Sequence, residues 1–201
     1  MENIKVVAFD CDGVMFDTNN ANSAYYNHLL TRFGKPRLTN EQFYYVHMHT
    51  ADESVEYLFG EEAEEVKDYC KTLTYKMFFP YMEIEPNLKQ VLETLRKKYK
   101  TAIATNRTSS MGSVLSEFSL TSFFDLVVTA LDVERPKPYP DPLIKILEHF
   151  NIESNQLIYI GDSQLDEESS HSAGVNFVAY NNLDLSADFH IKSLIELLNF
   201  L

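Results

Sequence analysis

Positive charge is scarce in this sequence. Its 201 residues contain 17 Lys and Arg against 30 Asp and Glu, which gives a formal net charge of −13. Nucleic-acid backbones are bound by clustered Lys and Arg, so the deficit argues against a nucleic-acid partner. The same negative field would oppose an anionic substrate, and a divalent cation would then be needed to overcome it.

Cysteines and long apolar runs are also scarce. Cys11 and Cys70 are the only cysteines, too few for a disulfide framework, and this favours a reducing compartment, with the cytoplasm as the expected location. The first residues carry no basic flank leading into a long apolar stretch, so neither a secretory signal nor a membrane span is expected. No feature of the sequence predicts an oligomeric state.

Short apolar runs are plentiful and indicate a sheet. The apolar share of 45% is that of a soluble globular protein. Most of the runs are continuous rather than alternating, which is typical of parallel strands buried on both faces. The predicted strands are residues 4–10, 101–105, 125–129, 157–161 and 175–180.

Helical periodicity fills the stretches between those strands. Apolar residues recur at helical spacing within 88–95, 111–118, 143–150 and 191–198. Asn87 after Pro86 marks one helix start, and Asp141 is expected to be an N-cap with Pro142 at the first helical position. The alternation predicts an α/β fold, a doubly wound parallel sheet of the Rossmann-like type.

Residues 17–85 interrupt this alternation. They offer no convincing strand but several helical stretches rich in Tyr and Phe, and Thr39 with Gln42 resembles a capping box. We therefore predict two domains: a discontinuous core formed by residues 1–16 and 86–201, and an inserted helical domain formed by residues 17–85.

Polar residues follow three of the predicted strands. The first strand leads into Asp10 and Asp12, the second into Thr105 and Asn106, and the fourth into Asp162, with Asp166 four residues later; Lys137 precedes the helix before that strand. In an open parallel sheet, ligands bind at the carboxyl ends of the strands. Three carboxylates, a hydroxyl beside a helix start and one ammonium form a set that suits Mg²⁺ and a phosphoryl group.

Four segments resemble the motifs of one superfamily. DCDGV, ATNRT, KPYPDP and GDSQLDEESSHSAG are similar, in order and spacing, to the motifs of the haloacid dehalogenase-like hydrolases. The resemblance is nearest to the phosphoglycolate phosphatase-like branch, which carries a helical cap between the first strand and the second motif. Residues 17–85 would be that cap.

The resemblance implies roles for the motif residues. Asp10 would be the nucleophile that forms an aspartyl-phosphate, and Asp12 the general acid and then the general base. Asp10, Asp162 and the backbone carbonyl of Asp12 would hold Mg²⁺, with Asp166 acting through water or by orienting Lys137. The phosphoryl oxygens would be bound by Thr105, Asn106 and Lys137.

The resemblance also implies an activity, with two alternatives open. The expected activity is Mg²⁺-dependent hydrolysis of a small phosphorylated metabolite, a phosphate monoester such as phosphoglycolate or a sugar phosphate. A sugar-phosphate mutase similar to β-phosphoglucomutase would use the same nucleophile and acid and would differ only in the fate of the phosphoenzyme. A non-catalytic member that binds a phosphorylated ligand or a partner is the other alternative.

Overall fold

The computed structural model describes residues 3–201 and divides them between two compact units. One unit comprises the described residues up to Phe16 together with Ile84–Leu201, and the other comprises Asp17–Glu83. The boundary of the second unit thus falls two residues before the predicted one at residue 85.

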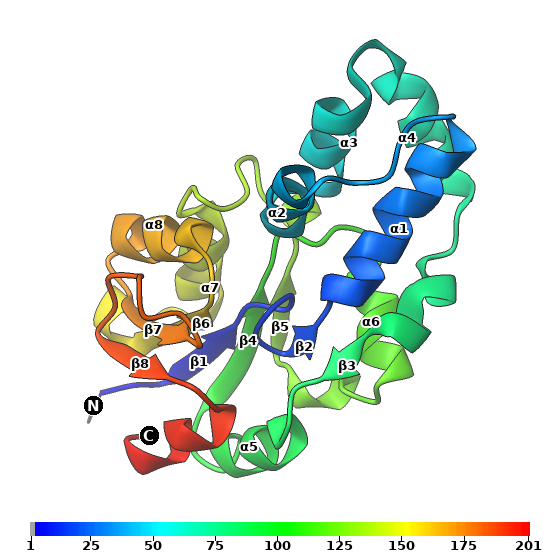
Figure 1. The fold of residues 1–201 in the computed structure, drawn as a ribbon. Coiled ribbons are helices and arrows are strands. Elements are labelled where there is room, and N and C mark those ends of the chain that lie inside the picture. Colours follow the sequence, from blue (N-terminus) through cyan, green and yellow to red (C-terminus); the bar gives the residue numbers. More distant parts are fainter. Residues whose placement is uncertain (1–2) are drawn as a thin grey trace. The chain divides into compact units, whose positions relative to one another are not determined.

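A six-stranded sheet forms the centre of the first unit (Figure 1). Every neighbouring pair of its strands is parallel, and the strand order is β5-β4-β1-β6-β7-β8. The strands are β1 Val6–Phe9, β4 Lys100–Ala104, β5 Leu126–Val128, β6 Leu157–Gly161, β7 Asn176–Tyr180 and β8 Phe189–Ile191. The predicted parallel α/β sheet is confirmed, with five strands in the predicted places.

The sixth strand, β8, was not predicted. It has three residues, of which Phe189 and His190 are exposed, so it lacks the apolar run that identified the others. It pairs with β7 at the edge of the sheet. A short edge strand with one buried side chain gives almost no periodic signal.

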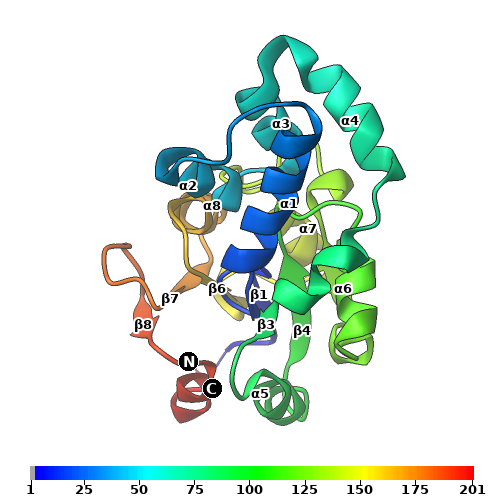
Figure 2. The same ribbon diagram turned by 45° about the vertical axis from the view of Figure 1, so that its right-hand side comes forward.

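Helices cover both faces of this sheet (Figure 1 and Figure 2). One face packs against α7 (Asp141–Phe150) and α8 (Gln164–Ala173), where Ala8, Tyr159 and Phe177 belong to a buried cluster. Side chains alternate along a strand, so Val7 and Phe9 point to the opposite face. Helix α5 (Leu88–Leu95) contacts β4 and the C-terminal 3₁₀ helix η6 (Leu194–Asn199), and α6 spans Met111–Glu117.

Two sequence-based expectations about helix ends are wrong. Asp141 is the first residue of α7 rather than its N-cap, and its carboxylate instead pairs with Arg135. The stretch 191–198 is not one helix, because Ile191 ends β8 and the helix that follows is the 3₁₀ element η6. The remaining 3₁₀ elements of this unit are short: η3 Thr121–Phe123, η4 Ala130–Asp132 and η5 Ser154–Gln156.

The second unit is helical and has its own core. Its elements are α1 Asn19–Arg32, α2 Asn40–Met48, α3 Ala51–Phe59, η1 Gly60–Glu62, α4 Ala63–Thr72 and η2 Tyr75–Tyr81. Leu29, Val46, Val55 and Val66 are buried together. The predicted capping box of Thr39 and Gln42 is confirmed. At the two points where the chain passes between the units, the two-residue strands β2 (Phe16–Asp17) and β3 (Glu83–Ile84) form a separate small sheet.

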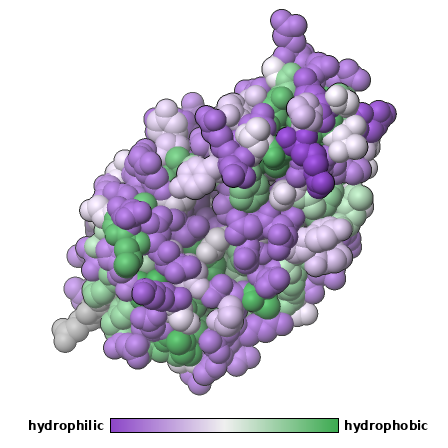
Figure 3. Space-filling model, viewed as in Figure 1, coloured by the Kyte–Doolittle hydropathy of each residue, from purple (hydrophilic) through white to green (hydrophobic). Residues whose placement is uncertain are grey.

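The surface is mainly hydrophilic on the face shown in Figure 3, where apolar side chains form separate patches. Large exposed apolar side chains within residues 3–201 come from several elements, among them Tyr44, Leu131 and Leu183. None of the helices in this part of the chain is both long and apolar enough to cross a membrane.

Candidate active site

The predicted site residues gather where neighbouring strands end. Asp10 directly follows β1, Thr105 follows β4 and Asp162 follows β6, and these three strands are adjacent and parallel. The backbone N–H of Asp10 still donates to Ile160 of β6 at 2.8 Å, and that of Thr105 donates to Val128 of β5 at 3.0 Å. The sheet therefore fixes the backbone of each residue before its side chain enters the site.

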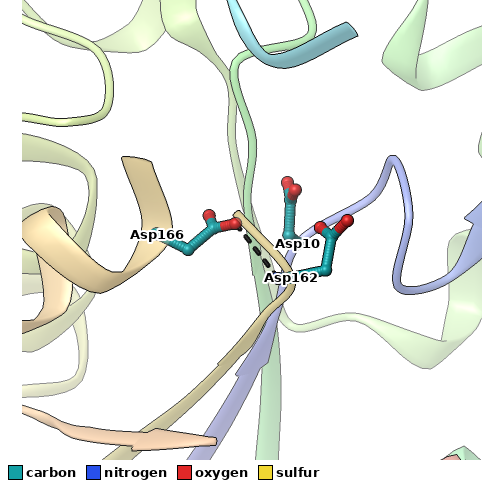
Figure 4. A group of neighbouring side chains, drawn as sticks. All are labelled: Asp10, Asp162 and Asp166. Carbon is teal, nitrogen blue, oxygen red and sulfur yellow. Dashed lines mark hydrogen bonds between the residues drawn. The ribbon is translucent and has the colours of Figure 1, made fainter. Parts of the chain in front are cut away.

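Three carboxyl groups form a cluster at this edge (Figure 4). One oxygen from each of Asp10, Asp162 and Asp166 lies within 4.8 Å of the others. Asp10 and Asp162 extend from strand ends, whereas Asp166 reaches the cluster from the first turn of α8. Such a set of oxygen ligands is what a hard divalent cation requires.

Asp166 is held from both sides by the protein. Its Oδ2 accepts hydrogen bonds from the Ser163 hydroxyl at 2.6 Å and from the backbone N–H groups of Asp162 and Ser163 at 3.2 and 3.1 Å. Its Oδ1 lies 2.5 Å from Nζ of Lys137 and 2.8 Å from the Tyr159 hydroxyl. Although burial opposes ionisation, the Lys137 ammonium and these donors lower the pKa of Asp166. Because both of its oxygens already accept hydrogen bonds from the protein, Asp166 suits an indirect role better than direct metal ligation.

Lys137 lies at the base of the cluster and is buried. Its Nζ donates to Asp166 and to the Tyr159 hydroxyl at 3.0 Å, and it lies 2.9 Å from Oδ1 of Asp10. Burial alone would lower the pKa of Lys137, but the carboxylates of Asp10 and Asp166 raise it above its ordinary value. Lys137 is thus a fixed positive charge beside Asp10.

The Asp10 carboxylate is only partly satisfied by its neighbours. Burial raises its pKa to about 7, with Lys137 opposing the rise and Asp166 and Asp12 adding to it. Despite the ion pair with Lys137, its buried Oδ1 receives no aligned hydrogen bond. Burial also raises the pKa of Asp162, which Asp166 and Asp10 raise further. A divalent cation bound by Asp10 and Asp162 would favour the ionised form of both side chains and offset the cost of burying their charge. These residues therefore fit Mg²⁺.

The side chain of Asp12 points to a different partner. Its two oxygens accept hydrogen bonds from Arg107, with Nε to Oδ2 at 3.0 Å and Nη2 to Oδ1 at 2.5 Å. The Asp12 carboxylate is not part of the three-membered cluster. This arrangement is compatible with the expectation that any metal contact of Asp12 is made by its backbone carbonyl.

Asn106 and Thr105 shape the other side of the site, and both are buried. The Asn106 side chain forms a reciprocal pair with the backbone of Lys137: its Nδ2 donates to the carbonyl at 2.9 Å, and its Oδ1 accepts from the N–H at 3.0 Å. The Thr105 hydroxyl accepts from the backbone N–H of Arg107 at 3.1 Å. The Asn106 side chain therefore places Lys137, and a phosphate contact by Asn106 would fall to its backbone.

Arg107 and Tyr159 contact the site but were given no role from the sequence. Tyr159 lies in the middle of β6, where the sequence gives no sign that it differs from the apolar strand residues beside it. Its hydroxyl nevertheless contacts Lys137 and Asp166 and donates to the Ala104 carbonyl at 2.9 Å. Arg107 directly follows Thr105 and Asn106, and that adjacency was the one available signal. The Ser163 capping box on α8 was available from the spacing of Ser163 and Asp166.

Gly13 lets the first motif approach Asp162. Its φ is +83°, in the left-handed region, and a Cβ at this position would overlap the Asp162 carboxylate. We expect Gly13→Ala to lose about 1–2 kcal/mol of unfolding free energy from the backbone alone and, because Asp162 must move, to lose most catalytic activity. Urea unfolding measures the first effect, and turnover of a substrate of the class expected from the sequence measures the second.

Gly174→Ala is the matched control for that substitution. Gly174 also lies in the first unit and has a φ of +68°, but an added Cβ would make only ordinary contacts with Ser154. The control should lose comparable stability and keep its turnover. Equal activity of the two variants would show that Gly13 does not matter to the placement of Asp162.

Comparison with known proteins gives a consistent result. Residues 7–180 match the family described as haloacid dehalogenase-like hydrolase. The crystal structure of a HAD-superfamily hydrolase, subfamily IA, variant 1, from Geobacter sulfurreducens is 38% identical in sequence, with a TM-score of 0.87. That similarity covers 98% of this chain and 100% of the other.

Curated relatives include named phosphatases. The pyrophosphatase PpaX of Bacillus mycoides is 28% identical over 183 residues, which cover 88% of this chain and 83% of the relative. A phosphoglycolate phosphatase from Haemophilus influenzae is 33% identical over 113 residues, covering 52% of this chain and 50% of that protein.

Proposed function

Because this chain belongs to the haloacid dehalogenase-like hydrolase family, we propose that it is a Mg²⁺-dependent phosphatase that hydrolyses a small phosphate monoester. The observation that carries the proposal is the buried carboxylate of Asp10, which lies at a strand end beside Lys137 and has an Oδ1 without an aligned hydrogen bond. An under-satisfied carboxylate next to a fixed cation is suited to attack on phosphorus.

In the first step of the proposed reaction, an oxygen of Asp10 attacks the phosphorus of the substrate. The bond from phosphorus to the leaving-group oxygen breaks as the aspartyl-phosphate forms, and Asp12 gives its proton to the leaving alcohol. Lys137, Thr105 and the backbone of Asn106 stabilise the charge on the phosphoryl oxygens, which is the main requirement of phosphoryl transfer.

In the second step, water attacks the same phosphorus. Asp12, now a carboxylate, takes the proton from that water, the bond from phosphorus to Asp10 breaks, and inorganic phosphate leaves. Both residues return to their starting states. The two steps need one group that acts first as an acid and then as a base, and Asp12 is placed on the loop directly after Asp10.

Mg²⁺ would be held by the carboxylates of Asp10 and Asp162 and by the backbone carbonyl of Asp12, with Asp166 acting through water or through Lys137. When bound, the cation neutralises charge on the transferring phosphoryl group and on the clustered acids. It would also offset the strongly acidic composition of the chain.

We further propose that the helical unit Asp17–Glu83 is a cap that selects the substrate. Support comes from its insertion directly after the first motif and from its independent core. Small-angle scattering with and without beryllium fluoride, an analogue of the phosphoryl group, is expected to detect closure. Identical curves would contradict this role of the cap.

A panel of phosphorylated metabolites tests the proposed activity. The relatives are named as acting on pyrophosphate and phosphoglycolate, so both belong in the panel beside sugar phosphates. We expect Mg²⁺-dependent release of inorganic phosphate from at least one of the monoesters. Conversion of a sugar phosphate to its isomer without phosphate release would instead establish the mutase alternative.

The substitution Asp12→Asn is expected to slow both chemical steps. An amide can neither give nor take the required proton, so turnover should fall by about 10²–10⁴-fold. The free energy of unfolding should also fall, because the Arg107 guanidinium loses its ion pair with the Asp12 carboxylate. Steady-state release of inorganic phosphate measures the fall in turnover, with Asp184→Asn, an exposed acid in the same unit, as the control. A loss below about tenfold would refute the assignment of Asp12 as general acid.

A further inference from the structure

Arg107 forms a partly buried bidentate pair with Asp12. The Arg107 side chain is 6% exposed and that of Asp12 is 17% exposed, and both Asp12 oxygens receive an N–H from the guanidinium. A planar guanidinium that binds both oxygens of a carboxylate fixes its plane as well as its position. The pair therefore leaves the Asp12 carboxylate little freedom to rotate.

Arg107 is itself held on the opposite side. Its Nη1 donates to the Ser110 hydroxyl at 3.2 Å, its backbone N–H donates to the Thr105 hydroxyl at 3.1 Å, and its carbonyl accepts from the N–H of Ala130 at 3.2 Å. The chain of contacts runs from the end of β4 through Arg107 to Asp12. One residue thereby links the backbone of the proposed phosphate-binding segment to the proposed proton donor.

Stability alone is a weak reason for this pair. Removing two charges from water costs free energy that their attraction often fails to recover, and apolar replacements of buried pairs are frequently neutral. The same bidentate geometry occurs in this unit between Arg135 and Asp141, with distances of 3.1 and 2.8 Å, but there the arginine is 54% exposed and Asp141 is the first residue of α7.

We propose that Arg107 is a positioning residue that orients Asp12 for both proton transfers: it binds both oxygens while Asp12 is a carboxylate, and it keeps a hydrogen bond to one oxygen while the other carries the proton. The inference rests on the proposed phosphatase function. It gives a role to Arg107, which lies within the motif ATNRT but was assigned no role from the sequence. Arg107 acts through Asp12 and not by contact with the reacting atoms. Its loss should therefore change the rate of the chemical steps and leave substrate binding almost unchanged.

Arg107→Met removes both hydrogen bonds while keeping much of the apolar stem. We expect kcat to fall by about 10–100-fold with KM changed less than about threefold, as for residues that orient a functional side chain. Arg107→Lys should recover part of the loss, because one charged donor remains. Arg135→Met is the matched control and should keep wild-type kcat and KM.

A double substitution shows whether Arg107 acts only by positioning Asp12 or also contributes to the reaction by itself. In the Asp12→Asn background, Arg107→Met is expected to reduce kcat by less than about twofold, because residues that act as a unit are not additive. A full additional loss in that background, a raised KM with unchanged kcat, or wild-type activity of Arg107→Met would each overturn the proposal.

A crystal structure of Arg107→Met tests the same inference without relying on activity. The Asp12 side chain should leave its wild-type orientation or occupy more than one. An unchanged, singly ordered Asp12 would overturn the positioning role even if the protein proved not to be a phosphatase. Absence of turnover in the wild-type enzyme, by contrast, would contradict the proposed function and not this role of Arg107.

Discussion

Asp10→Asn is expected to abolish turnover, with a fall in kcat of roughly 10⁴-fold or more, as for the loss of other covalent nucleophiles. The amide keeps nearly the shape of the carboxylate but cannot form the acyl-phosphate. Lys137 retains its ion pair with Asp166, so no buried charge is left alone. Release of inorganic phosphate from the best monoester of the panel measures the effect.

The loss should not come from unfolding. Burial already raises the pKa of Asp10 to about 7, which means that the folded protein disfavours the ionised form before a cation binds. A neutral amide at this position should therefore leave the free energy of unfolding unchanged or slightly higher, as urea unfolding would show. Turnover within tenfold of the wild type would exclude Asp10 as the nucleophile.

Removal of divalent metal is expected to have the second large effect. EDTA should reduce turnover to background, and excess Mg²⁺ should restore it, because the buried Asp10 and the partly buried Asp162 lack a sufficient counter-charge. A ligand that binds only the folded state raises its stability, so Mg²⁺ should also raise the melting temperature.

The substitution Asp162→Asn tests whether Mg²⁺ binds at the proposed site. It removes one proposed ligand, so the rise in melting temperature with Mg²⁺ should disappear or require a much higher concentration. Asp184→Asn, which alters an exposed acid, should respond to Mg²⁺ as the wild type does. Full activity in EDTA, or an undiminished response of Asp162→Asn to Mg²⁺, would contradict the proposed metal site.

The sheet was predictable because its strands are buried on both faces. Continuous apolar runs such as 157–161 are typical of buried parallel strands in a chain where strands and helices alternate. The edge strand β8 was not predictable, since it buries one side chain and takes its register from β7. The helix predicted over 191–198 is wrong because the apolar spacing there spans two different elements. Ile191 belongs to a strand and Leu194 to a 3₁₀ helix, although their spacing fits one helix.

The candidate site was predictable to the extent that its residues follow strand ends. Asp10, Thr105 and Asp162 lie together because β1, β4 and β6 are neighbours and parallel. Contacts made by long side chains were not predictable. Neither the reach of Arg107 to Asp12 nor the contact of Tyr159 with Lys137 follows from residue spacing, because both depend on distances across the sheet.

Trapping the phosphoenzyme tests the central claim, attack by Asp10, most directly. The enzyme would be mixed with Mg²⁺ and its best substrate, quenched, and treated with borohydride, which reduces an acyl-phosphate to an alcohol. Peptide mass spectrometry should then find homoserine at position 10, dependent on substrate and absent from Asp10→Asn. Active enzyme with no reduction at Asp10, or with the modification on another residue, would contradict the account.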